Sequence, residues 1–261
     1  MTASVQICAD PALRYVLRLG DSCLILAQRL GEWCGHGPVL EEDIALANMA
    51  LDLLGQSRAL LTLAGQLNQR AGGALLDEDQ LAFLRDERDY LNPTLMELPR
   101  GDFAFTVLRN AMVATWLKLV WQRLSDSTEP ELAAIAGKAV KEARYHQQHA
   151  ADWVVRLGDG SEESMRRMNV ALDELWRFGE ELFETDAVDE ASAAAGLGPR
   201  ADALRAPWLQ EMGAVLEEAG LTAPAPVKFR SAGKRGQHTE HMGFLLAQLQ
   251  HLQRAFPGGV W

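Results

Sequence analysis

The chain has 261 residues, of which 48% are hydrophobic and 23% are charged, and its formal net charge is −11. This length allows a substantial hydrophobic core, and the composition is that of a globular protein. The acidic balance argues against a nucleic-acid binder, which needs a concentrated basic surface, and against binding to an anionic membrane. No run of about 18 apolar residues and no signal-peptide pattern occurs, so we expect a cytoplasmic protein.

The cysteines, Cys8, Cys23 and Cys34, are odd in number and show no CxxC spacing. Cysteine is among the most frequently buried residue types. We therefore predict that they are small core residues rather than a disulfide or a metal-binding set.

Apolar residues recur at helical spacing through most of the chain, and β-type alternation is nearly absent. The pattern predicts long helices at about 12–34 and 41–68, the first ended by a glycine- and proline-rich turn and the second opened by acids. It predicts two more at about 103–125 and 129–157, the latter with Pro130 in its first turn. Shorter helices are expected at about 77–90, 161–184, 202–219 and 239–255, with an ordered loop at 222–237.

The lengths and connections of these helices favour one architecture. The four long helices form two pairs, and the crossover between the pairs, at about 69–102, is long. A ferritin-like bundle has this pattern, whereas a cytokine-like bundle needs two long crossovers. We predict an all-α fold, namely a single ferritin-like domain over 1–261 with additional C-terminal helices.

A ferritin-like bundle can hold two irons if two helices each supply a glutamate and the other two each supply Glu-x-x-His. Residues i and i+3 lie on one helix face, so both can reach a central metal pair. Three residues before His146 stands Ala143, and three before Gln56 stands Leu53, on a helix without histidine. The 103–125 helix contains no aspartate or glutamate. The sequence therefore predicts that this chain has lost the di-iron site.

Other polar residues of the predicted bundle have two interpretations each. Glu142 stands four residues before His146, which favours a side-chain pair over a metal motif. Lys118 could form a buried pair with Asp52 or Glu142 where metal would lie, because a buried charge needs a partner. A solvated Lys118 is the alternative.

A basic segment, 228–241, leads into the last predicted helix. It contains four basic residues, followed by two histidines, His238 and His241, at the helix start. A glycine-hinged basic loop in this place could receive a phosphate, or could dock on an acidic surface. The histidine spacing is compatible with zinc, but no further ligands are nearby in the sequence. Catalytic triads and phosphate-binding loops of the GxxxxGKS type are not found.

Several long motifs resemble the C-subunit family of bacterial ring 1,2-phenylacetyl-CoA epoxidases, and the likeness covers nearly the whole chain. These motifs are LRLGD (17–21), QRLGEWCGH (28–36), DLLGQ (52–56), KEARYH (141–146) and GKRGQHTEH (233–241). The resemblance implies a ferritin-like, non-catalytic subunit that holds a catalytic A subunit in an assembly. In place of the two Glu-x-x-His motifs of the A subunit, this chain has Leu53-x-x-Gln56 and Ala143-x-x-His146.

The resemblance also implies a distribution of cofactors and partners. It places the di-iron centre in the A subunit, with NADPH and the reductase cofactors elsewhere in the complex and none in this chain. The expected partners are the A subunit, a second copy of this chain and the small B subunit. We further predict a partner or coenzyme A contact in the basic segment, at Lys228, Arg230, Lys234, Arg235, His238 and His241.

An alternative remains open at this point. The chain could be an active di-iron oxidase with unconventional ligands, which would be Asp21, Asp52, Glu142 and His146. That hypothesis lacks a metal-bridging carboxylate that the sequence can place.

Overall fold

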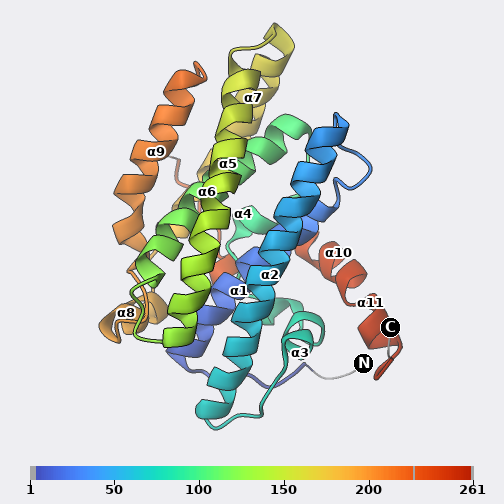
Figure 1. Cartoon of the computed structure of the whole chain (residues 1–261), viewed down its shortest axis with the longest axis vertical. Helices are drawn as coiled ribbons and strands as arrows, with labels where there is room; N and C mark the ends of the chain where they lie inside the picture. The colour runs from blue at the N-terminus through green and yellow to red at the C-terminus, as the bar shows by residue number, and fades with distance from the viewer. Residues whose placement is uncertain (1–3, 226, 260–261) are drawn as a thin grey trace. The chain divides into compact units, whose positions relative to one another are not determined.

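The computed structural model describes residues 4–225 and 227–259. The chain divides into two compact units, and Figure 1 shows its helices coloured by residue number. Unit 1 contains the chain up to Pro99 and from Ser231 onward, and unit 2 contains Arg100–Arg230. The regular elements of the described residues are helices, apart from one isolated β-bridge. The predicted all-α, ferritin-like fold class is confirmed, whereas the assignment of a single domain stays a prediction.

Unit 1 is built on two long helices that pack side by side, α1 (Pro11–Gly31) and α2 (Leu40–Arg70) (Figure 1). The carboxylate of Asp10 caps α1, because it accepts a hydrogen bond of 2.9 Å from the N–H of Leu13. Acids fill the first turn of α2, where the helix dipole stabilises negative charge. Both helices agree with the predicted ranges to within a few residues, as expected for helix ends.

The remaining elements of unit 1 are short. The predicted helix at 77–90 is too long, since the α-helix ends at Phe83 and the chain then turns Arg85 inward. The helix α4 was not predicted. These elements are α3 (Glu78–Phe83), the 3₁₀ helix η1 (Glu87–Asp89), α4 (Thr94–Glu97), the 3₁₀ helix η4 (Gly233–Arg235), α10 (Glu240–Leu249) and α11 (His251–Ala255).

Unit 2 is built on α5 (Phe103–Leu124) and α6 (Pro130–Gly158), which pack along one another. Asp102 caps α5 by accepting a hydrogen bond of 2.9 Å from the N–H of Phe105. The other elements are α7 (Glu162–Leu175), η2 (Trp176–Phe183), α8 (Ala187–Ala194), η3 (Ala201–Leu204) and α9 (Arg205–Glu218). The helix predicted at 161–184 is therefore α-helical only to Leu175, and α8 was not predicted. The first part of the helix predicted at 202–219 is likewise a 3₁₀ helix, η3.

The helix α5 is the one helix of the described residues that is long and apolar enough to cross a membrane. Of its most apolar 18-residue window, 83% is buried inside the protein. Core helices of globular proteins have these properties, so length and hydropathy give no specific indication of a membrane span.

Two glycines of α2 give matched tests of its packing. A Cβ atom added at Gly65 would lie 1.8 Å from the carbonyl oxygen of Leu76, whereas one added at Gly55 would meet nothing within 4 Å. We expect Gly65→Ala to lower the free energy of unfolding by about 2 kcal/mol or more through overpacking. Gly55→Ala should raise it by about 0.5–1 kcal/mol through helix propensity. Urea unfolding measures both, and equal effects would contradict this close contact.

Candidate functional site

The predicted ligand positions on α2 carry no carboxylate. Leu53 and Gln56 are both buried, and the Gln56 Oε1 atom lies 3.6 Å from the Cys23 thiol, which donates a hydrogen bond to it. Cys23 is thus a buried core residue on α1, as predicted, but the prediction is wrong for Cys34, which is exposed, and Cys8 is half-buried. A leucine and a neutral amide supply neither the charge nor the bridging oxygens that a pair of iron ions requires.

The corresponding positions on α6 are equally poor in acids. Ala143, which stands at the glutamate position of the predicted Glu-x-x-His motif, is buried. His146 is the residue of that motif that could still bind a metal. Glu142 is half-buried, and its Oε1 atom lies 3.5 Å from the ammonium of Lys138, one turn earlier. The 22 residues of α5 include no acid. Unit 2 therefore offers His146 and Glu142 at these positions, with Glu142 paired to a lysine.

Lys118 of α5 has a partner that the sequence did not indicate. Its ammonium forms an ion pair with Glu211 of α9, which also accepts a hydrogen bond of 2.6 Å from Gln147 Nε2. The same Gln147 amide lies 3.1 Å from the Thr115 hydroxyl. The predicted pairing of Lys118 with Asp52 or Glu142 stays a prediction, and the ion pair found here is within unit 2.

Asp21, a ligand in the alternative oxidase hypothesis, is bound on both carboxylate oxygens. The Arg85 guanidinium holds it bidentately, with Nη1 3.0 Å from Oδ2 and Nη2 in contact with Oδ1. The peptide N–H of Leu91 adds a third hydrogen bond, of 2.9 Å to Oδ2. Both side chains are fully buried. A carboxylate neutralised in this way is not available to a metal ion without breaking a buried ion pair.

Arg85 also organises the crossover segment around it. Its guanidinium donates to the carbonyls of Leu81 and Asp89, and lies 4.1 Å over the ring of Tyr90. Burial by itself lowers the pKa of Arg85, but the charge and the hydrogen bonding of Asp21, together with the nearby Tyr90 and Asp89, outweigh burial and hold that pKa above its ordinary value. Burial raises the pKa of Tyr90 to about 12, so its hydroxyl is protonated and donates to the Ala82 carbonyl.

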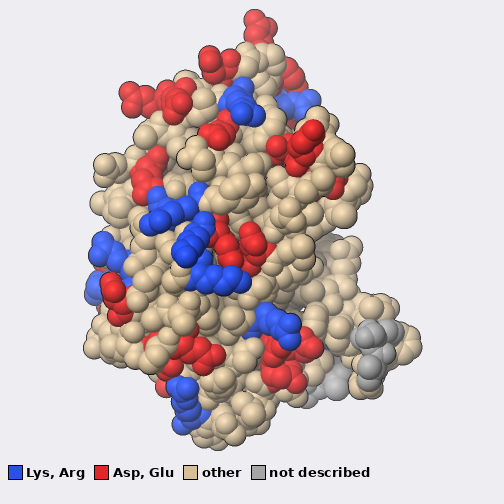
Figure 2. Space-filling model, viewed as in Figure 1, with Lys and Arg blue, Asp and Glu red and all other residues tan. Residues whose placement is uncertain are grey.

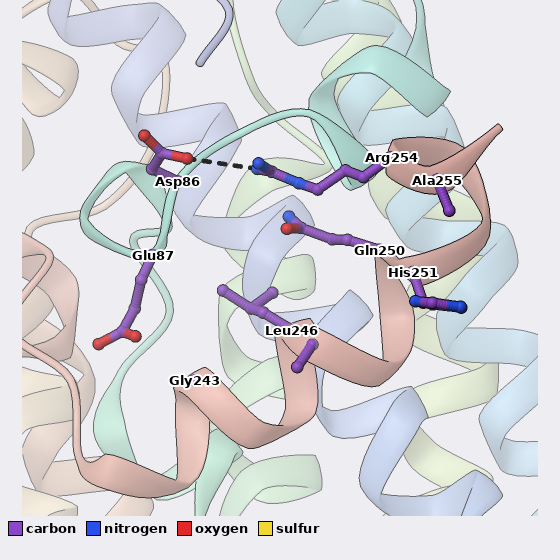
Figure 3. Close-up of a pocket in the computed structure, with 9 residues that line it drawn as sticks. Asp86, Glu87, Gly243, Leu246, Gln250, His251, Arg254 and Ala255 are labelled. Carbon is purple, nitrogen blue, oxygen red and sulfur yellow. Dashed lines mark hydrogen bonds and ion pairs between the residues drawn. The ribbon is translucent and has the colours of Figure 1, made fainter. Parts of the chain in front are cut away.

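The C-terminal helices join this network from α10 and α11. Gln250 donates hydrogen bonds of 2.9 Å to the Arg85 carbonyl and 2.8 Å to the Tyr90 hydroxyl. Arg254 donates to the same carbonyl at 2.7 Å. Figure 3 shows Gln250 and Arg254 reaching from these helices toward the turn at Asp86, with an ion pair of 3.3 Å between Arg254 and Asp86. The groove in that view has a volume of about 500 Å³.

A second buried network fixes the end of the predicted basic segment. The buried Glu97 carboxylate accepts four hydrogen bonds, from Asn92 Nδ2, His238 Nδ1, and the peptide N–H and hydroxyl of Thr239. The His238 Nδ1 atom lies 2.6 Å from Glu97 Oε2, and its Nε2 atom lies 2.9 Å from the carbonyl oxygen of Tyr90. Arg29 donates to the Glu97 carbonyl at 2.7 Å.

This geometry assigns a protonation state to His238. Both ring nitrogens face an acceptor, so both must carry a proton to donate, and the ring is an imidazolium. Burial by itself lowers the pKa of His238, but the hydrogen bond and the charge of Glu97 outweigh it and raise that pKa above its ordinary value. The pair is therefore a buried ion pair that ties the 231–241 segment to α4.

The six residues predicted to contact a partner or coenzyme A do not form one surface group in either unit. Lys228 and Arg230 are exposed and belong to unit 2, where Arg230 lies 3.4 Å from Glu184. Lys234, Arg235, His238 and His241 belong to unit 1. Of these, Lys234 is buried, the His238 side chain is fully buried, Arg235 is exposed and His241 is half-buried. Their contact with a partner stays a prediction, and the contacts found for His238 are structural.

In the part of the chain that the structure describes, no group of three or more His, Cys, Asp or Glu side chains has an arrangement that could hold a metal ion. On the face shown in Figure 2, Lys and Arg side chains stand in small groups among Asp and Glu.

Sequence reasoning missed Arg85, Glu97 and Gln250 as network residues. The one signal was Asp21, an acid inside an apolar helix, which predicts a buried partner without naming it.

The fold defines a class, an all-α protein of the ferritin-like type, and Leu53, Gln56 and Ala143 stand at the positions where the sequence predicts that di-iron ligands have been lost. Comparison with known proteins identifies a family within this class. The family model described as "Phenylacetic acid catabolic protein" matches residues 3–261, and the chain belongs to this family. It is 49% identical over 247 residues to the C subunit of 1,2-phenylacetyl-CoA epoxidase from Escherichia coli K12, and the match covers 95% of this chain and 98% of that protein.

Proposed function

We propose that this chain is a non-catalytic structural subunit of a cytoplasmic phenylacetyl-CoA epoxidase complex, and that it binds and stabilises the catalytic di-iron A subunit. Its similarity to a C subunit over nearly its full length supports the assignment to such a complex. The observation that carries the non-catalytic part is the loss of acids at the ligand positions, with Leu53, Gln56 and Ala143 in their place.

The residues present do not fit a di-iron centre. Two irons need several carboxylates to neutralise and bridge them. α5 supplies none, and Asp21 is neutralised by Arg85. The alternative of an oxidase with Asp21, Asp52, Glu142 and His146 as ligands would require the fully buried Asp21–Arg85 pair to open. We therefore place the di-iron centre in the A subunit, and NADPH and the reductase cofactors elsewhere in the complex.

Co-expression with the catalytic subunit tests this role. We expect the untagged chain to co-purify with a tagged A subunit at a fixed ratio, together with the small B subunit when it is present. A second copy of this chain in the assembly would be seen in the mass measured by light scattering. We also expect the A subunit to unfold at a lower temperature when this chain is withheld. An A subunit that neither retains this chain nor loses stability without it would contradict the proposal.

Substitutions in this chain separate the structural role from a catalytic one. His146→Ala should leave the epoxidation rate of the reconstituted complex within about twofold of the parent, because His146 holds no reacting group. A metal-ligand role would predict a loss of about a hundredfold or more, since even outer-shell partners of metal ligands contribute 10–100-fold. The matched control is the equivalent substitution of a ligand histidine in the A subunit.

A further inference from the structure

A small pocket on unit 1 has the features of an anion site. Its volume is about 280 Å³, and its walls come from the segment 4–7, from α1 and from the turn at η1. Arg14 of α1 and Arg88 of η1 both line it, although they are far apart in the sequence. The buried side chains of Leu17 and Leu91 line it as well. Two arginines from distant parts of the sequence thus line one small pocket that also has an apolar wall.

These two arginines differ from most others in the chain. In the part that the structure describes, nearly every arginine side chain has a hydrogen bond, an ion pair or a ring contact. The described arginines whose side chains have none are Arg14, Arg88, Arg123 and Arg144. Two of these four share one pocket, in a protein whose net charge is −11. An acidic protein could neutralise them with its own carboxylates, and here it does not.

The walls of the pocket are held by hydrogen bonds. The Ser4 hydroxyl donates to Asp89 Oδ2 at 2.5 Å, and the peptide N–H of Asp86 donates to Ser4 Oγ at 3.2 Å. The peptide N–H of Val5 bonds the Leu84 carbonyl at 3.3 Å. The backbone of Arg88 packs under Gly236, where an added Cβ would lie 2.2 Å from the Arg88 carbonyl oxygen. The site is therefore preorganised, which limits the entropy lost when a ligand binds.

Among the described residues that line the pocket, Asp89 is the one acid. Its Oδ2 atom accepts hydrogen bonds from Ser4 and from the peptide N–H of Asp86. Its carbonyl oxygen accepts one from Arg85 at 2.9 Å. The carboxylate is thus bound by the Ser4 hydroxyl and the Asp86 peptide N–H, and the two arginines outnumber it at the pocket.

We propose that this pocket binds a phosphate group, with Arg14 and Arg88 as its principal ligands. Guanidinium groups bind phosphate oxygens through paired charge-assisted hydrogen bonds. Gln6 and Ile7 also line the pocket, and within the described residues their peptide N–H groups form no hydrogen bond, so we include these groups as further donors in the proposal. The ligand class is inorganic phosphate or a phosphate monoester, such as the one on the ribose of coenzyme A. The site is independent of the proposed structural role.

Thermal unfolding of the full chain tests the site. Sodium phosphate should raise the midpoint temperature above that in sodium chloride of equal ionic strength, because a ligand that binds the folded state stabilises it. Arg14→Gln and Arg88→Gln should each weaken the apparent affinity for phosphate by about tenfold or more. The matched control is Arg144→Gln, which removes another exposed arginine without a side-chain partner among the described residues, in unit 2, and should leave the affinity unchanged.

Two further probes identify the source of the phosphate. Tighter binding of adenosine 3′,5′-bisphosphate than of inorganic phosphate, with no effect of adenosine, would indicate a nucleotide monoester. Equal affinities would indicate free phosphate, and both results support the site. An equal response to chloride and phosphate would overturn the proposal, as would an undiminished response in both arginine variants. Each response is measured against the same variant without phosphate, so a change in basal stability does not obscure it.

Discussion

Replacing Arg85 with methionine is expected to lower the free energy of unfolding by about 3–5 kcal/mol, because it leaves Asp21 as an uncompensated buried charge. Both side chains are 0% exposed, and the bidentate contact is supplemented by the Leu91 N–H. The substitution also removes the hydrogen bonds to the carbonyls of Leu81 and Asp89, which are then unsatisfied. Urea-induced unfolding followed by circular dichroism measures the change.

The control for Arg85 is another ion pair of unit 1. Arg58 lies 2.9 Å from Glu78, but its side chain is 76% exposed. Exposed pairs contribute about 0–1 kcal/mol, so Arg58→Met should have a small effect. If Arg85→Met cost no more than Arg58→Met, the buried pair would not be the link between α1 and the crossover segment.

The His238–Glu97 pair predicts a pH dependence with a definite sign. Because the pKa of His238 is raised in the folded state, the pair stabilises the fold fully below the ordinary pKa of about 6.5. That stabilisation is lost as the pH rises through the raised pKa of His238. For one proton, the free energy of unfolding falls by no more than about 1.4 kcal/mol per pH unit. We expect the free energy of unfolding to fall over this window in the parent, and to fall less in His238→Gln.

Glu97→Gln should reverse this behaviour and destabilise the chain by about 3 kcal/mol or more. An amide in this position turns one acceptor into a donor, which then faces the donors that met the carboxylate. Burial of His238 remains, and burial favours the neutral imidazole, so the pKa of His238 should fall below its ordinary value. The stability of the variant should then rise with pH near 6.5. The same pH slope in the parent and in Glu97→Gln would show that His238 is not the titrating group.

Much of the secondary structure followed from local signals. The helix predicted at 103–125 is observed as Phe103–Leu124, because its apolar spacing and its Asp102 cap act over a few residues. The same signals misjudged 161–184, where the apolar periodicity continues while the backbone tightens to 3₁₀ at Trp176. Spacing alone cannot separate these two helix types over one or two turns.

The buried networks could not be predicted in the same way. Asp21 and Arg85 are 64 residues apart, and Glu97 and His238 are 141 apart, so only the tertiary fold brings them together. His238 was predicted as a partner-contact residue because it follows a basic run; that contact stays a prediction, and the buried carboxylate of Glu97 beside His238 was not foreseen. The absence of acids at Leu53, Gln56 and Ala143 was readable from spacing alone, since it depends on residue identity within one helix.

The metal content of this chain tests its non-catalytic role most directly. The chain would be produced with iron supplementation, purified without the A subunit, and measured by inductively coupled plasma mass spectrometry, with the A subunit as the positive control. We predict iron far below one atom per chain while the A subunit retains its iron. Near two irons per chain, lost in Glu142→Ala or His146→Ala, would contradict the account and make this chain a metalloenzyme in its own right.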